Sequence, residues 1–390
     1  MRVCMVAYTF YEGDNRVRRY AESLKRRGDQ VDAIVLRQDG AASFAQVSGV
    51  NVYKIQKRAL DEKKKMDYLV KLLLFLVRSA VLLARLQFKK GYDLVHVHSV
   101  PDFEVFAALV PKLFGAKVVL DIHDIVPELF ASKFGAKQGS LLFRMLVLME
   151  RLSMAFSDHV IVANHIWHER LVVRSVPPRK CSVVMNYPDP HIFIRKANMR
   201  RVRGKHYVIV YPGTLSIHQG LETAIRAVHK LKEQIPELQF HIYGKGTDES
   251  YFVSLVRDLG LEDRVFFRGI VPIEKLPEVI EQADLGVEPK LSRTFGNEAF
   301  STKILEFMAM GVPVVASDTL VHSRYFDETL LQFFRSEDVD DLSSKILRVR
   351  NDVQLRERMV NNALKFMQEN NWEAKKHLYH ALVDSLVKGE

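Results

Sequence analysis

The sequence has little of several features that would narrow its class at once. It contains only 2 cysteines in 390 residues, Cys4 and Cys181, and each lies in an apolar, strand-like run. Two separated cysteines exclude a disulfide-rich scaffold and indicate small buried side chains in a reducing compartment. Within the apolar segment Tyr68–Phe88, the longest uninterrupted apolar run, Leu72–Val77, is far shorter than the roughly 20 residues that a membrane span needs. We therefore do not expect this segment to cross a bilayer.

Signatures of several enzyme and binding classes are also missing. Neither half of the chain has G-x-G-x-x-G after its first strand, which argues against a dinucleotide dehydrogenase. The D-x-D arrangement of metal-dependent sugar transferases is absent from the strand ends, and Asp121-Ile-His123-Asp124 lacks further ligands. We expect no metal and no other cofactor. The chain starts directly in a strand without a basic and apolar leader, and we expect a cytoplasmic location.

Length and charge set the remaining limits. At 390 residues, two domains are expected. The formal net charge of +10 predicts acidic partners, namely nucleic acid, nucleotides or anionic lipid. No nucleic-acid-binding motif is present, and acidic residues are interspersed with most basic clusters. We therefore expect no nucleic-acid partner, and favour a nucleotide together with a lipid surface.

Short apolar strands alternate with helical patterns, which predicts repeated βα units and an α/β fold with parallel sheets. The expected strands lie near residues 2–7, 31–36, 93–98, 117–122 and 158–163, and then near 207–211, 238–243, 264–267, 284–287 and 312–316. This order predicts two Rossmann-like domains facing each other across a cleft, with ligands at the carboxyl ends of the strands. The predicted bounds are 1–195 for the N-terminal domain, 206–370 for the C-terminal domain and 371–390 for a helix packing back toward the first domain, with the charged stretch 196–205 as the linker.

The most informative motif is a pair of carboxylates, Glu298 and Glu306, on either side of an expected helix start. Apolar residues recur at helical spacing from Ile304, and Gly311 is placed to end that helix before a buried strand. A helix N-terminus offers free N–H groups and a positive dipole end to phosphate. Carboxylates beside it would repel phosphate, but they are suited to accept hydrogen bonds from sugar hydroxyls. The motif therefore predicts a site for a sugar nucleotide.

Four motifs together resemble the retaining glycosyltransferases of family GT4, which have the GT-B fold. They are the E-x7-E pair Glu298 and Glu306 with its Gly-Val-Pro-Val-Val tail, the loop Gly213–Gly220, the segment Asp284–Pro289, and the first-domain segments Asp93–His98 and Leu120–Asp124. The E-x7-E pair alone is a weak signal. The four motifs span nearly the whole chain, and together they make the resemblance specific.

The resemblance implies how the second domain holds its donor, a nucleotide diphosphate sugar. Glu306 would hold the ribose hydroxyls, and Glu298 would contact the transferred sugar. The backbone of Phe300, Ser301 and Thr302 would lie along the donor sugar and phosphate, although the family often has Gly-Phe-Gly where this chain has Ala-Phe-Ser.

The sequence departs from the family pattern at the positions that would contact the diphosphate. The family usually has Arg and Lys where this chain has Thr214 and Gln219. Charge for the leaving diphosphate must then come from helix N–H groups, from Lys303 or from another cation. Lys303 has two interpretations, a phosphate contact or an ordinary solvated helix lysine. The predicted donor site also includes Gly213, Gly220, Gly244 and Gly246.

The resemblance assigns the acceptor to the first domain. His123 follows a strand at its carboxyl end, where a family histidine approaches the donor sugar and acceptor, so His123 and Glu298 are the predicted catalytic residues. Asp124 lies close enough in sequence to orient an acceptor hydroxyl. Of two histidines on one strand face, His98 is nearer the strand end and is the better candidate for the cleft, while His96 is assigned to structure.

A loop after the first strand matches the acceptor-side loop of the family in position. It contains Gly13 but lacks the usual double glycine. Arg16, in the same loop, has two interpretations: it meets phosphate on a lipid-linked acceptor, or it faces solvent.

The segment Tyr68–Phe88 combines an apolar body with a basic stripe. Lys64, Lys71, Arg78 and Arg85 follow one another in steps of seven, which keeps them near one helix face. One interpretation is a core helix whose stripe is solvated. The other is a helix on the membrane surface whose basic residues meet lipid phosphate, which would place the protein at the inner face of the cell membrane.

The predicted function is that of a retaining hexosyl- or N-acetylhexosaminyl-transferase. It would move a sugar from a nucleotide diphosphate sugar, with UDP favoured, to a hydroxyl of a lipid-linked or cell-envelope glycan. Two alternatives stay open: a GT-B sugar-nucleotide epimerase, which needs no acceptor, and a non-catalytic sugar-nucleotide-binding subunit, which the missing Arg and Lys would suit.

Overall fold

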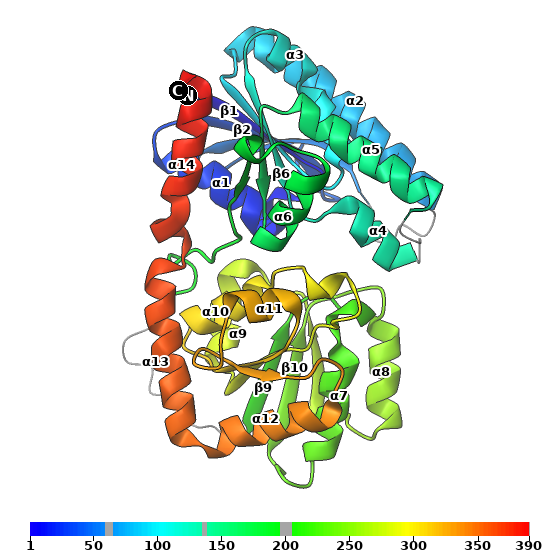
Figure 1. Cartoon of the computed structure of the whole chain (residues 1–390), viewed down its shortest axis with the longest axis vertical. Helices are drawn as coiled ribbons and strands as arrows, with labels where there is room; N and C mark the ends of the chain where they lie inside the picture. Colours follow the sequence, from blue (N-terminus) through cyan, green and yellow to red (C-terminus); the bar gives the residue numbers. More distant parts are fainter. Residues whose placement is uncertain (59–64, 135–138, 196–204, 390) are drawn as a thin grey trace. The chain divides into compact units, whose positions relative to one another are not determined.

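The computed structural model describes residues 1–58, 65–134, 139–195 and 205–389 (Figure 1). The chain forms two compact units, one comprising Met1–Asn186 with Lys376–Glu390 and the other Tyr187–Lys375. The division therefore falls before the charged stretch expected to be the linker, most of which lies outside the described residues. Residues after Asn186 join the second unit through buried contacts: Phe193 is 5% exposed, and the backbone N–H of Trp372 donates to the carbonyl of Pro188 at 3.0 Å.

The first unit is built on an eight-stranded sheet with the order β3-β4-β2-β1-β5-β6-β7-β8. All neighbouring strands are parallel except β3 and β4, which form an antiparallel hairpin. The strands are β1 Arg2–Ala7, β2 Gln30–Arg37, β3 Phe44–Val47, β4 Val50–Lys57, β5 Leu94–His98, β6 Lys117–Ile122, β7 His159–Val162 and β8 Cys181–Val183. The hairpin and β8 were not predicted from the sequence.

Helices cover both faces of this sheet. They are α1 Asn15–Arg26, α2 Lys65–Lys90, α3 Leu109–Leu113, α4 Val126–Phe134, α5 Leu141–Phe156, α6 His165–Arg174 and α14 Trp372–Lys388, with 3₁₀ turns η1 Tyr11–Gly13, η2 Asp102–Ala108 and η3 Pro178–Lys180. α2, α3 and α5 lie on one side of the sheet, and α1 and α14 lie on the other (Figure 1). Asp14 begins α1 by accepting hydrogen bonds from the N–H groups of Arg16 and Val17.

The second unit has a six-stranded, wholly parallel sheet with the order β11-β10-β9-β12-β13-β14. Its strands are β9 Tyr207–Pro212, β10 Leu238–Tyr243, β11 Val265–Gly269, β12 Leu285–Glu288, β13 Val314–Ser317 and β14 Gln332–Phe334. Its helices are α7 Leu221–Leu231, α8 Glu249–Asp258, α9 Leu276–Glu281, α10 Thr302–Ala309, α11 Leu320–Tyr325, α12 Val339–Asn351 and α13 Val353–Glu369, with 3₁₀ turns η4 Ile217–Gln219, η5 Ile273–Lys275 and η6 Phe295–Asn297. The expected α/β architecture of two Rossmann-like units is confirmed.

The strand order reverses at one place in each sheet. In the second unit β9 lies between β10 and β12, and the chain proceeds outward in opposite directions from those two strands. In the first unit β1 lies between β2 and β5 in the same way. Ligands of open parallel sheets bind at the carboxyl ends of the strands at such a switch point. Ligand-binding residues are therefore expected in the loops after β9 and β12, and in those after β1, β5 and β6.

Two further sequence expectations concern burial and membrane crossing. Cys4 and Cys181 are both buried free thiols, as predicted. Within the described residues, none of the helices combines the length and the apolarity that crossing a bilayer requires.

Candidate active site

Two glycine loops of the second unit lie against each other at the carboxyl ends of β9 and β10. The N–H of Leu215 donates to the carbonyl of Lys245 at 3.1 Å. A Cβ on Gly244 would lie 1.9 Å from the carbonyl oxygen of Gly213, and one on Gly246 would lie 2.0 Å from that of Leu215. Such approaches are possible only without a side chain. The structure thus brings together three glycines of the predicted donor site, Gly213, Gly244 and Gly246, with the exposed Thr214 beside them.

The same β9 loop also contacts the loop after β12. Gly220 has a left-handed φ of 69°, and a Cβ there would lie 1.8 Å from the carbonyl oxygen of Pro289. Helix α7 begins immediately after Gly220 without a side-chain cap from the described residues. The Oε1 atom of Gln219 and the Nδ1 atom of His218 are buried, and neither has a hydrogen-bond partner in the described part of the chain.

Helix α10 starts between the two predicted carboxylates. Ser301 occupies its N-cap position, is 2% exposed, and has a hydroxyl without a hydrogen-bond partner among residues that the structure describes. Its side chain does not cap the helix. By contrast, α11, α12 and α13 are capped by Thr319, Asp338 and Asp352, whereas α8 and α9, like α10, start without a side-chain cap from the described residues. The first N–H groups of α10 are thus left for a ligand.

The two glutamates and Phe300 occupy different surroundings around this helix start. Glu298 lies directly after η6 and is half-buried, whereas Glu306 lies within α10 and is buried. Phe300 packs on Tyr325 and Phe326, with ring centroids 5.0 and 5.9 Å apart. This packing fixes the backbone that precedes α10.

Lys303 is not an ordinary solvated lysine. Its Nζ lies 2.7 Å from Oε2 of the fully buried Glu288 and 4.3 Å from the centre of the Tyr211 ring. Burial alone would lower the pKa of Lys303, but the Glu288 carboxylate raises it above its usual range. Burial would likewise raise the pKa of Glu288, but Lys303 and Lys290 lower it. The pair is therefore ionised, and a Cβ on Gly213 would lie only 2.9 Å from the Lys303 Nζ.

Sequence reasoning missed three residues at these strand ends. Glu288 ends a buried strand, where an unpaired charge is costly. That position was the sequence signal that Glu288 has a charged partner. Lys290 donates to the carbonyl of Ala299 at 2.7 Å and so holds the segment before α10. Lys245, between Gly244 and Gly246, is exposed, and the described residues provide no ion-pair or hydrogen-bond partner for its side chain. A lysine between two glycines after a strand was the available signal.

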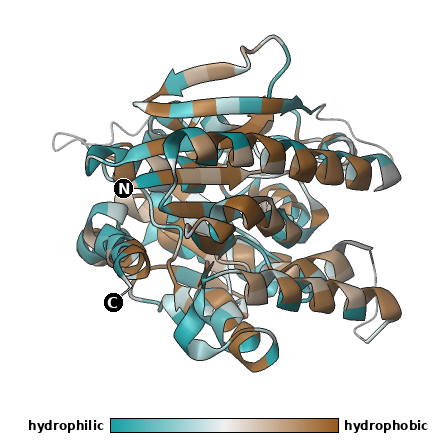
Figure 2. Cartoon of the chain, turned by 90° about the horizontal axis from the view of Figure 1, so that it is seen from above, coloured by the Kyte–Doolittle hydropathy of each residue, from teal (hydrophilic) through white to brown (hydrophobic). Residues whose placement is uncertain are grey.

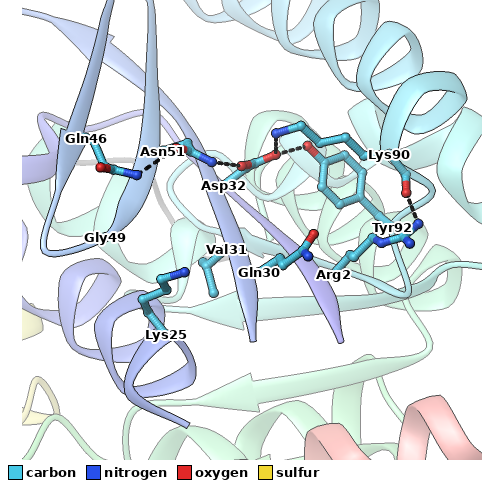
Figure 3. A pocket seen from close by; sticks show the side chains of 10 residues that line it. All are labelled: Arg2, Lys25, Gln30, Val31, Asp32, Gln46, Gly49, Asn51, Lys90 and Tyr92. Carbon is cyan, nitrogen blue, oxygen red and sulfur yellow. Dashed lines mark hydrogen bonds and ion pairs between the residues drawn. The ribbon is translucent and has the colours of Figure 1, made fainter. Parts of the chain in front are cut away.

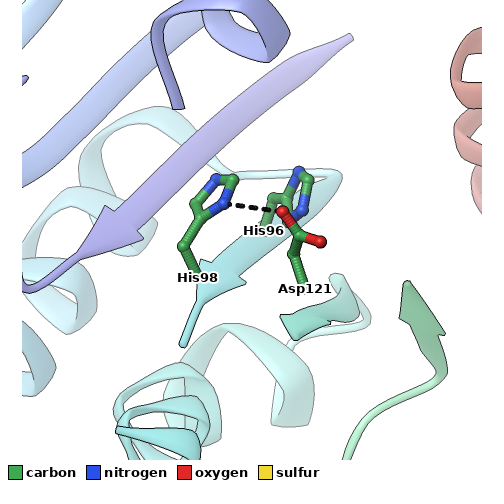
Figure 4. Close-up of side chains that lie close together, drawn as sticks. All are labelled: His96, His98 and Asp121. Carbon is green, nitrogen blue, oxygen red and sulfur yellow. Dashed lines mark hydrogen bonds and ion pairs between the residues drawn. The ribbon is translucent and has the colours of Figure 1, made fainter. Parts of the chain in front are cut away.

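In the first unit, Asp121 contacts three side chains, Arg16 of α1 and the strand-end histidines His98 and His123. Arg16 donates to both of its oxygens, from Nε at 2.7 Å and from Nη2 at 2.6 Å, and Nη2 also donates to the carbonyl of Val184 at 2.9 Å. His98 Nδ1 and His123 Nε2 each lie 3.1 Å from Oδ2 of Asp121 (His98 in Figure 4), and these two ring nitrogens are 3.2 Å apart. Only His123 in this group is substantially solvent-accessible, at 21% side-chain exposure.

The electrostatics of this network keep its carboxylate ionised. Burial would raise the pKa of Asp121, but the Arg16 guanidinium and His123 hold it well below its usual range. Burial lowers the pKa of His98 despite its contact with Asp121. Behind His98, the ring of His96 stacks at 4.2 Å and its Nδ1 lies 2.9 Å from the hydroxyl of Tyr379 on α14. The network is thus a fixed support for His123.

Burial changes the roles predicted for two acceptor-side residues. Arg16 is 4% exposed and ion-paired with Asp121, so it neither faces solvent nor stands open to a phosphate. His98 is 1% exposed and contacts Asp121 and His123. Gly13 is exposed at the end of η1, and Asp124 is half-buried beside His123. His123, Asp124 and Gly13 remain the accessible members of the predicted set.

His96, His98 and Asp121 have ligand-type atoms within 4.8 Å of one another (Figure 4). Three such groups resemble a metal site, but both oxygens of Asp121 already bind a guanidinium and His96 Nδ1 already contacts Tyr379. A second cation would be repelled by Arg16. The donor set therefore does not fit a metal ion, and the absence of a metal remains a prediction.

A separate pocket lies at the opposite, amino-terminal end of the first sheet (Figure 3). It encloses about 120 Å³, and Asp32 in its wall accepts from Asn51 at 2.9 Å, Lys90 at 2.6 Å and Tyr92 at 2.5 Å. Pockets for drug-sized ligands measure roughly 300–1,000 Å³. The size and the internal pairing of this pocket favour a structural role over donor binding.

Comparison with known proteins agrees with this arrangement. The profile of the family "Glycosyl transferase 4-like domain" matches residues 13–187, and that of "Glycosyl transferases group 1" matches residues 195–366. An uncharacterised glycosyltransferase of Methanocaldococcus jannaschii is 27% identical over 90% of this chain and 89% of its own length. The amylovoran biosynthesis glycosyltransferase AmsK of Erwinia amylovora is 28% identical over 42% of this chain and 40% of its own.

Two solved structures share the fold over the whole chain. Sucrose-phosphate synthase from Thermosynechococcus elongatus has a TM-score of 0.81 at 19% identity and covers 100% of both chains. The Anabaena protein HepE, solved in complex with UDP, has a TM-score of 0.70 at 16% identity and covers 98% of this chain and 100% of its own.

Proposed function

Because the chain belongs to the GT4-type glycosyltransferases with the GT-B fold, we propose that it moves a hexosyl or N-acetylhexosaminyl group from a UDP-sugar to a hydroxyl of a lipid-linked or cell-envelope glycan, with retention of configuration. The proposed location is the cytoplasm, at the inner face of the cell membrane. The chain would need no metal and no other cofactor.

The observation that carries the donor assignment is the uncapped start of α10 between Glu298 and Glu306. The buried hydroxyl of Ser301 lacks a partner among the described residues, and the first N–H groups of the helix have no side-chain cap there. Buried polar groups without partners are rare, and a diphosphate would satisfy both. Glu306, four residues into the helix, is then placed to accept hydrogen bonds from the ribose hydroxyls, and Glu298 from the transferred sugar.

Lys303 and Lys245 are the proposed replacements for the missing Arg and Lys. Lys303 is kept charged by Glu288 beneath Gly213, which is a suitable place for the inner phosphate. Lys245 is exposed on the neighbouring loop and is free to reach the outer one. Together they would stabilise the charge that develops as the nucleoside diphosphate leaves, a term worth several kcal/mol in such sites.

The proposed transfer needs no protein nucleophile. The acceptor hydroxyl attacks on the face that the leaving diphosphate vacates, its oxygen bonds to the anomeric carbon, and its proton passes to the departing phosphate oxygen. His123, held by Asp121, would contact the sugar or the acceptor. The UDP-bound neighbour HepE supports the choice of base, and the amylovoran biosynthesis relative supports a glycan acceptor.

Isothermal titration with UDP tests the donor site. Glu306→Ala should weaken UDP binding at least tenfold, about 1.4 kcal/mol, because the ribose loses its acceptor. Glu262→Ala, an exposed glutamate of the same unit, is the matched control and should bind as the unaltered chain does. Equal UDP affinity of the two variants would remove Glu306 from the ribose site.

Product analysis tests the reaction. His123→Ala should bind UDP normally but lose transfer. Release of UDP only when acceptor is present would support transfer, whereas conversion of the donor sugar without acceptor would favour the epimerase.

A further inference from the structure

Three neighbouring helices of the first unit expose an unusual number of large apolar side chains. In Figure 2 the long helices on the right of the view are brown along much of their length. We define the apolar platform as the exposed residues Leu69, Val70, Leu73, Leu74, Val77, Val81 and Phe88 of α2, Leu109, Leu113 and Phe114 of α3 and the turn after it, and Leu141, Leu142, Met145, Leu148, Met149 and Leu152 of α5. Contiguous patches of this kind mark interaction sites.

Helix α5 exposes its apolar face and buries polar side chains, the reverse of an ordinary surface helix. Its six exposed apolar residues are spaced one, three or four positions apart, so they share one face. Its buried residues are Glu150, Ser153 and Met154, and Glu150 pairs with Arg174 at 2.6 Å. A helix that buries a salt bridge and exposes a leucine-rich stripe is not built only to cover a core. Its outer face therefore offers an apolar surface to a partner.

Helix α2 is apolar on two faces. Leu72, Phe75, Leu83 and Leu86 are buried, while Val70 and Val77, at 58% exposure each, point outward. Both α2 and α5 pack on η2, and α2 also packs on α3, so the platform has a common support. This extends the sequence prediction, which recognised the basic stripe of α2 but not the contribution of α5.

The charges of the platform have nearly one sign. The exposed charged residues described on the three helices are Asp67, Arg78, Arg85, Lys89, Arg144 and Arg151. Arg78 and Arg85 on α2, and Arg144 and Arg151 on α5, are each seven residues apart and so follow their helix faces. An apolar stripe flanked by basic side chains is the pattern of a helix lying in the interface of an anionic bilayer.

We propose that the apolar platform docks on an anionic lipid bilayer, with its leucine, methionine and valine side chains among the acyl chains and its arginines at the lipid phosphates. A second copy of the chain fits less well, because a two-fold pairing would bring the four arginines together. The proposal deepens the proposed function, since it places the chain on the surface that would carry a lipid-linked acceptor. Vesicle binding can be measured without donor or acceptor, so the two proposals fail separately.

Vesicle flotation at low and moderate salt tests the platform. The unaltered chain should float with vesicles of seven parts phosphatidylcholine to three parts phosphatidylglycerol, and at least tenfold less with pure phosphatidylcholine. The triple variant Leu141→Ser, Met145→Ser, Leu148→Ser should lose binding at least tenfold. The matched control Val173→Ser, Ile270→Ser, Val353→Ser removes equally exposed apolar groups elsewhere and should float normally.

Two double variants test how much the arginines contribute to vesicle binding. Arg85→Gln with Arg144→Gln should reduce flotation on anionic vesicles severalfold, and Arg179→Gln with Arg358→Gln, two exposed arginines elsewhere, should not. Circular dichroism and thermal unfolding of each variant verify that it is folded. No flotation of the unaltered chain, equal flotation of the two triple variants, or self-association abolished by the Leu141 variant without vesicle binding would overturn the proposal.

Discussion

The carboxyl ends of the two sheets differ in their helix starts and in how the central carboxylate is bound. In the second unit, Ser301, Gln219 and His218 each bury a polar atom that has no partner in the described chain, and α7 and α10 start without side-chain caps. In the first unit, Asp121 is saturated by Arg16, His98 and His123, although Nη1 of Arg16 and Nε2 of His98 are buried without a partner among the described residues. The contrast agrees with the proposal that the second-unit edge takes a charged ligand, and it shows that the first-unit edge holds one accessible histidine in place.

Removing the Arg16 guanidinium that binds Asp121 in the first unit should have the largest effect on stability. Arg16→Leu leaves the Asp121 carboxylate buried and unpaired, which should destabilise the first unit by about 3–5 kcal/mol. Urea unfolding measures the loss. Arg179→Leu, an exposed position, should change stability by less than about 0.5 kcal/mol. Similar stabilities of the two variants would show that the network is not structural.

Removing the Lys303 ammonium group from the second unit should reduce both UDP affinity and folding stability. Lys303→Met should weaken UDP binding about tenfold and, because Glu288 loses its partner, destabilise the chain by roughly 3 kcal/mol. Adding Glu288→Gln to Lys303→Met should restore stability but not UDP affinity. If the double variant also regained UDP affinity, Lys303 would serve only to neutralise Glu288.

The two units also differ in how a buried carboxyl makes their stability depend on pH. Burial raises the pKa of Glu104, in η2 of the first unit, to about 8, whereas Glu288 in the second unit is kept ionised by Lys303. A carboxyl whose pKa is raised by folding makes its full contribution to the free energy of unfolding at a pH below its ordinary pKa. This contribution is lost as the pH rises toward 8. Between pH 6.5 and 7.5 the loss should be about 1.4 kcal/mol.

Thermal unfolding across that pH range measures this loss. Glu104→Gln keeps an oxygen for the hydroxyl of Ser79 and should flatten the decline relative to the unaltered chain. Identical pH profiles for the two proteins would show that Glu104 is ionised in the folded state.

The smallest predicted effect lies behind the histidine network. Tyr379→Phe removes the hydroxyl that lies 2.9 Å from His96, and it should cost about 1 kcal/mol of stability. UDP affinity should not change, because Tyr379 belongs to the first unit. A change in UDP affinity as large as that of Glu306→Ala would contradict this separation of roles.

The sequence predicted the architecture because strands buried on both faces are continuous apolar runs, which local patterns reveal. It missed the hairpin β3–β4, whose strand Phe44–Val47 is only partly buried, and it missed β8 and β14, which are three residues long. The glycines of the predicted donor site do lie at close backbone approaches, which loop patterns reveal because loop geometry depends on local residues, and their donor role stays a prediction. The state of Arg16 was not, because its partner Asp121 is 105 positions away, and no local pattern encodes such a pair.

Helix α14 has a consequence for the order in which the protein is made. A ribosome completes β8 of the first unit and then adds the whole second unit before it reaches Lys376. At about 5–20 residues per second, the intervening 190 or so residues take roughly 10–40 s. Throughout that interval His96 and Tyr20 lack the ring of Tyr379, which packs 4.3 Å from Tyr20. The first part of the protein to be synthesised is therefore the last to be finished, and its histidine support is completed only after the donor-binding unit has had time to fold.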